Sequence, residues 1–225
     1  MKSKNYWDYL VEDGRMYQMG GQSHRIYLLD LLAGQKNDRI VQVNPIRSLL
    51  DIGCGTAPIY ELLQMDAKKN DSKWDIIEKY KGSDYSEGMI RVCKKEFPQG
   101  DFAVEDARSL SEETASFDCV LLLHCLDHLD DYEKAINEAA RVSRKYVCIV
   151  LWREFTTNGL NNLNDKNSYG RDDGGHWEDT HLQDYSKEKL LEAFKKAKLN
   201  LVLDKSDEEI NKEGKHNTLF LLEKI

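Results

Sequence analysis

Short apolar runs alternate with segments of helical periodicity from residue 47 onward. Runs this short predict strands, and several are apolar without interruption, which is typical of strands buried on both faces of a parallel sheet. The predicted strands are 47–52, 81–84, 101–105, 117–124, 146–152, 199–204 and 218–223.

Between these runs, apolar side chains recur every three or four residues and predict amphipathic helices. Ile59, Leu62 and Leu63 mark the first helix, and Pro58 fits its opening turn. Ser86 is suited to cap the next helix, because its hydroxyl can accept a hydrogen bond from a backbone N–H. Further helices are predicted over 131–143 and 186–198.

This alternation predicts an α/β fold with a doubly wound, mostly parallel, seven-stranded sheet. The last two strands, 199–204 and 218–223, have no helical pattern between them, so we expect antiparallel pairing at one edge of the sheet. Residues 1–46 lie outside the alternation and are predicted to form a helical N-terminal cap. Residues 153–185 are rich in Asn, Asp and Gly and are predicted to form an insertion or lid after the fifth strand.

The composition bounds the class of protein. The 225 residues suffice for a single domain over 1–225, in which 47–225 form the core. No apolar run approaches the roughly 20 residues that span a bilayer, and the start of the chain lacks the apolar stretch of a signal peptide. The five cysteines form no C-x-x-C pair, which predicts free thiols in the cytoplasm. The formal net charge of −8 disfavours a nucleic acid partner, because an acidic surface repels phosphates.

A glycine-rich turn follows the first strand in the sequence LLDIGCGTAP, residues 49–58. Glycines let the backbone turn sharply and let a ligand approach where a Cβ would collide. Ligands of open α/β sheets bind beyond the carboxyl ends of the strands, so the turn predicts a nucleotide-type site. Pro58 occupies the third position of a dinucleotide fingerprint, and Asp51 would repel a pyrophosphate. An acid there suits a ligand with a positive end, such as the ammonium or sulfonium of S-adenosylmethionine.

The same run resembles motif I of the class I, Rossmann-like, S-adenosylmethionine-dependent methyltransferases, with Ala57 in place of the last glycine of the motif. The resemblance covers residues 47–152 and implies S-adenosyl-L-methionine as the cofactor. The cofactor-binding residues that it implies are Tyr17, Arg25, Asp51, Gly53, Cys54, Gly55, Asp84, Tyr85, Asp106, Ala107 and Leu123.

The acids after the second and third strands have specific roles in that family. By resemblance, Asp84 accepts hydrogen bonds from the ribose hydroxyls, and Asp106 accepts one from the adenine amino group. The backbone N–H of Ala107 would contact the adenine ring, which Tyr85 and Leu110 would sandwich.

Each of these residues also has a plainer structural interpretation. The glycines could make an ordinary strand-to-helix turn, which the side chain of Asp51 could cap. Asp84 could favour the N-terminus of the next helix, and Asp106 could start a turn. Their positions at the ends of three successive strands favour the binding interpretation.

The fourth strand ends in the sequence LLLHCLDH, residues 121–128, where the family places the transferable methyl group. His124 is the candidate general base, because an unperturbed histidine titrates near neutrality. It could equally shape the pocket. His176 is a second candidate base, in the sequence HWEDTH (176–181), and no metal site is predicted there because the histidine spacing fits no standard ligand motif.

Two residues of the N-terminal segment fall where the family often places a lid over the methionine end of the cofactor. They are Tyr17 and Arg25, and Arg25 could pair with the methionine carboxylate. The aromatic residues of this segment could instead serve to pack the cap onto the core.

These observations predict methyl transfer from S-adenosylmethionine to an O or N nucleophile of a small-molecule acceptor, without a membrane partner. A protein or RNA methyltransferase is the first alternative. Further alternatives are a non-catalytic cofactor-binding subunit and an NAD(P)-dependent oxidoreductase, and the latter is disfavoured by Pro58 and Asp51.

Overall fold

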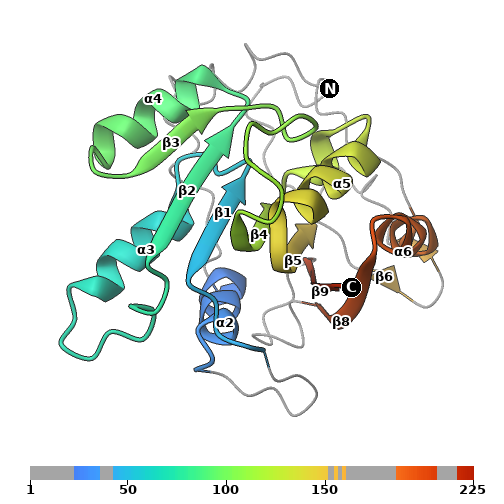
Figure 1. Ribbon diagram of the computed structural model, residues 1–225, viewed down its shortest axis with the longest axis horizontal. Coiled ribbons are helices and arrows are strands. Elements are labelled where there is room, and N and C mark those ends of the chain that lie inside the picture. The colour runs from blue at the N-terminus through green and yellow to red at the C-terminus, as the bar shows by residue number, and fades with distance from the viewer. Residues whose placement is uncertain (1–22, 36–42, 152–154, 157–158, 161–185, 207–216) are drawn as a thin grey trace, which may run out of the picture.

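The computed structural model describes residues 23–35, 43–151, 155–156, 159–160, 186–206 and 217–225 (Figure 1). Seven strands form one sheet: β1 (Ser48–Ile52), β2 (Lys79–Asp84), β3 (Asp101–Val104), β4 (Phe117–Leu123), β5 (Ser143–Leu151), β8 (Leu199–Ser206) and β9 (Thr218–Lys224).

The sheet has the strand order β3-β2-β1-β4-β5-β9-β8. The first five strands in that order run parallel, and β9 runs antiparallel to both β5 and β8. The predicted α/β fold and the predicted antiparallel pairing at one edge are therefore confirmed. The strand that reverses direction is β9, one place in from the edge. The chain changes its winding direction between β1 and β4, where open α/β sheets bind ligands at the carboxyl ends of the strands.

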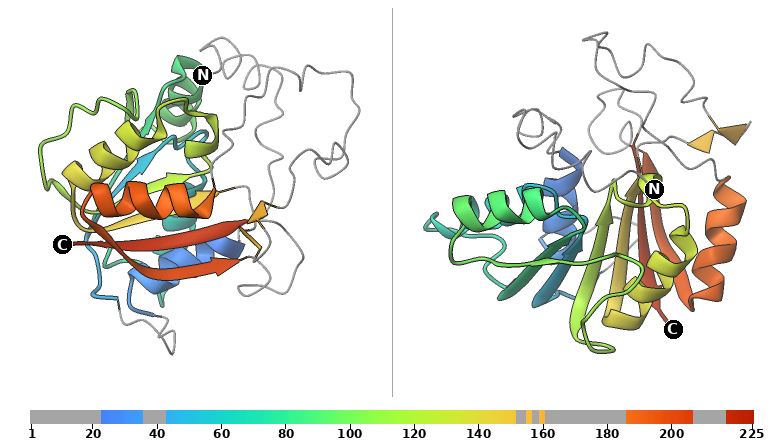
Figure 2. Two further views of the ribbon diagram at one scale, coloured as in Figure 1. Left: turned by 90° about the vertical axis from the view of Figure 1, so that its right-hand side faces the viewer. Right: turned by 90° about the horizontal axis from the view of Figure 1, so that it is seen from above.

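Helices cover both faces of this sheet (Figure 2). The helices α2, α3 and α4 pack on one face, and α5 and α6 pack on the other. Their bounds are α2 Ser23–Leu32, α3 Pro58–Ala67, α4 Glu87–Glu96, α5 Tyr132–Val142 and α6 Lys187–Lys196, with a 3₁₀ turn, η2, over Leu126–His128.

The predicted helix starts are confirmed by the local contacts. Pro58 opens α3, where its missing N–H costs no hydrogen bond. The Ser86 hydroxyl accepts a hydrogen bond from the backbone N–H of Met89 at 3.0 Å and so caps α4.

The central strand β4 is buried at every position. Alternate side chains enter opposite layers, because successive residues of a strand point to opposite faces. Cys119 and Leu121 pack in the layer under α2, α3 and α4, whereas Val120 and Leu122 pack in the layer under α5 and α6. A strand buried on both faces gives the fixed frame from which the loops at its carboxyl end project.

Only parts of the predicted cap and insertion belong to the described residues. In the cap, α2 buries the side chains of Leu28, Leu29, Leu31 and Leu32 against the sheet. In the insertion, β6 (Phe155–Thr156) and β7 (Gly159–Leu160) form a short antiparallel pair. In the part of the chain that the structure describes, no helix has the length and apolar character to cross a membrane.

Candidate functional site

The glycine turn after β1 is bonded to the end of the neighbouring strand β2. The N–H groups of Gly53 and Cys54 both donate to the carbonyl of Ser83, at 2.7 and 2.9 Å. Gly53 has a φ of 70°, and a Cβ at this position would lie 2.9 Å from Cys125 Sγ. Both the backbone conformation and the space therefore require glycine.

Ala57 lies where the related motif has its last glycine, and it adopts a left-handed conformation with φ 61° and ψ 48°. This conformation costs an L-residue roughly 1–2 kcal/mol. The methyl group is fully buried, and burial of one such group offsets about 0.8 kcal/mol. Alanine thus fulfils the turn function of the glycine, since it places Pro58 directly at the start of α3.

Asp84, at the end of β2, joins the glycine turn to the start of α4. Its Oδ2 accepts a hydrogen bond from the N–H of Gly55, and its Oδ1 accepts one from the N–H of Ser86, both at 2.9 Å. Gly55 has a φ of 55°. The side chain is held from two sides at the carboxyl end of the sheet, which fixes the position of its charge.

Asp51 is buried within β1, with 2% of its surface exposed. The Tyr80 hydroxyl donates a hydrogen bond to Asp51 Oδ2 at 2.9 Å. Burial raises the pKa of Asp51 to about 7, although the hydrogen bond from Tyr80 and the positive charge of Arg25 act in the opposite direction. Burial also lowers the pKa of Arg25, and the attraction of Asp51 counteracts that effect. The structure thus brings Arg25 of α2 into the electrostatic environment of Asp51.

Asp106 follows β3 and is held by a residue two positions further along. Asp106 Oδ1 accepts hydrogen bonds from the backbone N–H and the Nε–H of Arg108, both at 2.9 Å. Asp106 Oδ2 accepts one from an Arg108 terminal nitrogen at 2.6 Å. Hydrogen bonds from the Arg108 side chain lower the pKa of Asp106, so this carboxyl group is ionised at neutral pH.

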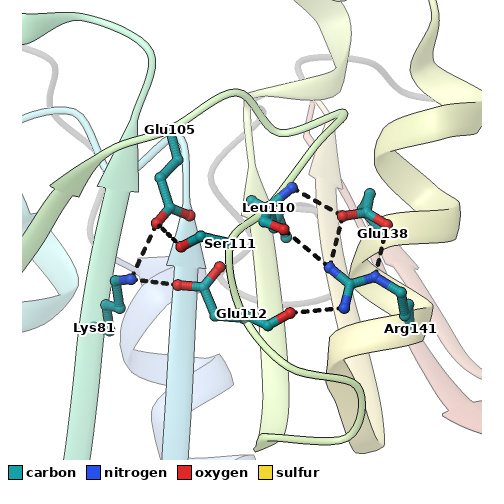
Figure 3. Close-up of polar contacts among 7 residues, drawn as sticks. All are labelled: Lys81, Glu105, Leu110, Ser111, Glu112, Glu138 and Arg141. Carbon is teal, nitrogen blue, oxygen red and sulfur yellow. Dashed lines mark hydrogen bonds and ion pairs between the residues drawn. The ribbon is translucent and has the colours of Figure 1, made fainter.

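The loop over 105–112 is tied to β2 through Lys81 (Figure 3). The Lys81 ammonium donates to Glu105 Oε1 at 3.1 Å and also to Glu112 Oε1. The Ser111 hydroxyl donates to the same Glu105 oxygen at 2.7 Å. One cation therefore balances two carboxylates that are 9% and 5% exposed.

The same loop is tied to α5 on its other side (Figure 3). Glu138 accepts a hydrogen bond from the N–H of Leu110 at 2.8 Å, and Arg141 donates to the carbonyls of Leu110 and Glu112 at 3.1 and 2.7 Å. Glu138 and Arg141 also pair with each other at 2.7 Å. These anchors hold the segment that carries Asp106 in place without any ligand.

At the end of β4, Leu123 is buried and His124 adopts a φ of 58°. The N–H of His124 donates to the carbonyl of Val150 at 2.7 Å, and its Nε2 lies 3.3 Å from Nε2 of His24 on α2. Burial holds the pKa of His124 well below its usual range, and the positive potential of His24, Arg25 and His128 acts in the same direction. The His124 ring is therefore neutral at neutral pH.

The sequence-predicted residues fall into three groups. Most of them lie at the carboxyl ends of β1, β2, β3 and β4. In this group Tyr85, next to Asp84, has 38% of its surface exposed, whereas Ala107 is buried. Cys54 is also in the turn, but its thiol lies inside the protein, 3.8 Å from the carbonyl of Gly55, to which Cys93 Sγ also donates at 3.1 Å. Tyr17 and His176 lie outside the described residues. Among the described residues, no group of three or more His, Cys, Asp and Glu side chains could hold a metal ion.

His24, Lys81, Arg108 and Arg141 are site residues that the sequence reasoning did not identify. The position of His24 depends on how α2 packs against the sheet, for which a single sequence carries no signal. Arg108 had a local signal, because a cation two residues after the acid can fold back onto it.

The part of the chain that carries this site is similar to known methyltransferases. Residues 50–150 match the family model of the methyltransferase domain. The ubiquinone/menaquinone biosynthesis C-methyltransferase UbiE of Campylobacter jejuni is 34% identical over 108 residues. That match spans 48% of this chain and 44% of the relative, so this chain matches about half the length of that protein.

Solved structures with low sequence identity share the fold. A Haloferax volcanii methyltransferase, in complex with the Trm112 methyltransferase activator, has a TM-score of 0.65 and 16% identity, with 96% of each chain covered. The Burkholderia thailandensis 1,6-didemethyltoxoflavin-N1-methyltransferase was solved with 1,6-didemethyltoxoflavin and S-adenosylhomocysteine bound. It has a TM-score of 0.64 and 15% identity, with 98% of this chain and 86% of that chain covered.

Proposed function

We propose that this chain, whose residues 50–150 form a methyltransferase domain of the class I, S-adenosylmethionine-dependent family, transfers a methyl group from S-adenosyl-L-methionine to an O or N nucleophile of a small-molecule acceptor. One observation carries the proposal. The carboxylates Asp51, Asp84 and Asp106 lie on or just after three adjacent parallel strands, beside a turn in which Gly53 leaves no room for a side chain.

The residues present fit the ribose and methionine parts of such a cofactor. Asp84 would accept hydrogen bonds from the ribose hydroxyls, because its carboxylate is held at the carboxyl end of the sheet by the N–H groups of Gly55 and Ser86. Asp51 pairs with the methionine ammonium, which compensates the cost of ionising this buried acid. Arg25 pairs with the methionine carboxylate.

The loop after β3 fits the adenine part. Asp106 accepts a hydrogen bond from the 6-amino group, and the N–H of Ala107 contacts the ring. The half-exposed Tyr85 and the buried Leu110 sandwich it. The anchored loop needs no rearrangement to form this site, which reduces the entropic cost of binding.

When bound, S-adenosylmethionine supplies a methyl carbon on a cationic sulfur. The protein aligns the acceptor with that carbon and excludes water at the end of β4, near Leu123. His124 would accept the proton of a hydroxyl acceptor as the methyl group is transferred. Its ring is neutral and can take up a proton, although the burial that lowers its pKa also makes it a weaker base. An amine acceptor that binds uncharged needs no base. We keep Tyr17 as a cofactor contact and His176 as a second candidate base.

The proposed acceptor is a small molecule for two reasons. The net charge of −8 disfavours RNA, and the toxoflavin methyltransferase, which shares the fold, was solved with a small molecule bound. All five cysteines are free thiols, which supports the cytoplasmic location that we propose.

Thermal unfolding with S-adenosylmethionine, S-adenosylhomocysteine, NAD and NADP added separately tests the cofactor. A ligand that binds only the folded state raises the melting temperature. We expect a rise with the two adenosyl compounds and none with the nicotinamides; a rise with the nicotinamides alone would refute the proposal.

Labelled methyl transfer to panels of phenols, amines and quinols, with protein and RNA fractions alongside, then tests the acceptor. Label on an oxygen or nitrogen of a small molecule is the expected result. Label on carbon, the atom named for the Campylobacter C-methyltransferase, or label on protein or RNA would refute this part of the proposal.

A further inference from the structure

The Asp106 carboxylate is held by Arg108 at three points, through one backbone and two side-chain nitrogens. The two charged groups are similarly shielded, with side chains 28% and 25% exposed. Ser109 closes the same turn by donating its N–H to the carbonyl of Asp106 at 2.9 Å. The turn therefore fixes the rotation of the carboxylate as well as its position.

These contacts use the acceptor sites of the carboxylate unevenly. Each carboxylate oxygen has about two acceptor sites. Oδ1 accepts two hydrogen bonds from Arg108, whereas Oδ2 accepts one. Within the described part of the chain, one acceptor site on Oδ2 is therefore left for a ligand.

Arg108 has further polar neighbours and lies on an anchored loop. Tyr85 and Asp131 contribute to its electrostatic environment, in addition to Asp106. The loop on which it lies is anchored through Leu110 to Glu138 and Arg141. The Asp106 carboxylate therefore has one remaining acceptor site and lies on a loop that is fixed at both ends. Such a group can discriminate between a ligand that donates a hydrogen bond and one that does not.

We propose that Arg108 is a specificity-determining positioning residue, which orients Asp106 so that its remaining acceptor site selects a 6-amino purine over a 6-oxo purine. The inference rests on the proposed function, because it assumes that Asp106 contacts the base. A 6-oxo purine presents an oxygen where the 6-amino group donates, and two acceptors facing each other repel.

Calorimetric titration with S-adenosylhomocysteine and with its 6-oxo counterpart, S-inosylhomocysteine, tests this role without any turnover. We expect the wild type to prefer the adenosyl compound by roughly tenfold or more, since a charge-assisted hydrogen bond is lost with the other. Arg108→Ala should bring the two affinities to within about threefold, mainly by weakening the adenosyl compound, because the freed Asp106 side chain must be ordered on binding.

Two further variants separate geometry from charge and from folding. Arg108→Lys retains the positive charge but not the planar fork, so its affinity ratio should be close to that of Arg108→Ala. Arg91→Ala removes the same charge from the exposed face of α4 and should leave the ratio at the wild-type value. Melting curves of all variants check that each is folded.

The outcomes are distinguishable. An unchanged ratio in Arg108→Ala overturns the inference, and so does tighter binding of the adenosyl compound, which would mean that Arg108 competes with the base for Asp106. Equal wild-type affinities for both compounds overturn the inference alone. Failure of the wild type to bind either compound overturns the proposed cofactor as well.

Discussion

The imidazoles of His24 and His124 meet through their Nε2 atoms, 3.3 Å apart, although 100 residues separate them in the chain. The two rings lie edge to face. One of the two nitrogens must donate and the other accept, so the tautomer of one ring determines which nitrogen of the other carries the proton at this contact. The contact connects helix α2 with the end of β4, where we place methyl transfer.

His124→Asn should slow methyl transfer to a hydroxyl acceptor by at least about tenfold, because the proton loses its acceptor. Asparagine is chosen because it tolerates the positive φ of this position better than alanine does. The affinity for S-adenosylhomocysteine, measured by calorimetry, should stay within about twofold of the wild type and serves as the internal control. Unchanged turnover with a hydroxyl acceptor would remove His124 from the chemistry.

Asp84→Asn should weaken S-adenosylhomocysteine binding by roughly ten- to a hundredfold, because it removes charge-assisted hydrogen bonds to the ribose. The variant keeps one carbonyl oxygen but loses the hydrogen bond from either Gly55 or Ser86, so its melting temperature without ligand should fall, and the affinity is measured at a temperature at which the variant is folded. Asp101→Asn, which removes the same charge from an exposed position on β3, is the matched control. Equal calorimetric affinities of the two variants would place the ribose elsewhere.

Asp51→Asn should change how stability depends on pH. The pKa of Asp51 is raised to about 7, so the folded protein retains a proton that the unfolded chain has already released. The wild type therefore loses stability from about pH 4 to pH 7, by at most roughly 1.4 kcal/mol per pH unit. Urea denaturation between pH 5 and pH 8 measures the free energy of unfolding of both proteins. The free energy of unfolding of the variant minus that of the wild type should increase up to about pH 7 and stay constant above it. A difference that shrinks as the pH rises would contradict the raised pKa.

Lys81→Met should destabilise the protein by about 2–4 kcal/mol, since it leaves two shielded carboxylates without their shared cation. Chemical denaturation measures the loss, and Lys94→Met on the exposed face of α4 provides the control. Adding Glu112→Gln to Lys81→Met should recover part of the stability, because one of the two like charges is then removed. No recovery would mean that the network of Figure 3 acts through something other than charge balance.

The parts of the fold and the site that depend on local sequence could be predicted. The buried strands are evident as apolar runs. The turn after β1 is evident from its glycines, because the positive φ at Gly53 favours glycine over other residues. The strand β5 begins earlier than predicted, at Ser143 directly after α5, because its first residues are polar and give no apolar run, although Ser143 itself is buried. Likewise β2 begins at Lys79, where the exposed Lys79 and the partly buried Lys81 alternate with the buried Tyr80.

Contacts between distant parts of the chain could not be predicted. His24 and His124 come together only once α2 has packed on the sheet. Lys81 and Arg141 meet the loop over 105–112 from opposite sides, and a charged residue on a strand or helix looks the same in a sequence whether it faces solvent or a buried partner. Charge pairing of this kind is specified by the fold as a whole.

The position of β9 in the sheet, between β5 and β8, has a consequence for the synthesis of the protein. The strands that carry the proposed cofactor site, β1 to β4, all precede β5 in the chain, so their loops can assemble while synthesis continues. The edge of β5 that pairs with β9 nevertheless has no partner strand until residues 218–224 have been translated. An apolar strand with an unpaired edge is a template for pairing with other chains. The nascent protein therefore passes through a period in which its binding loops can be formed while its sheet is still prone to aggregation.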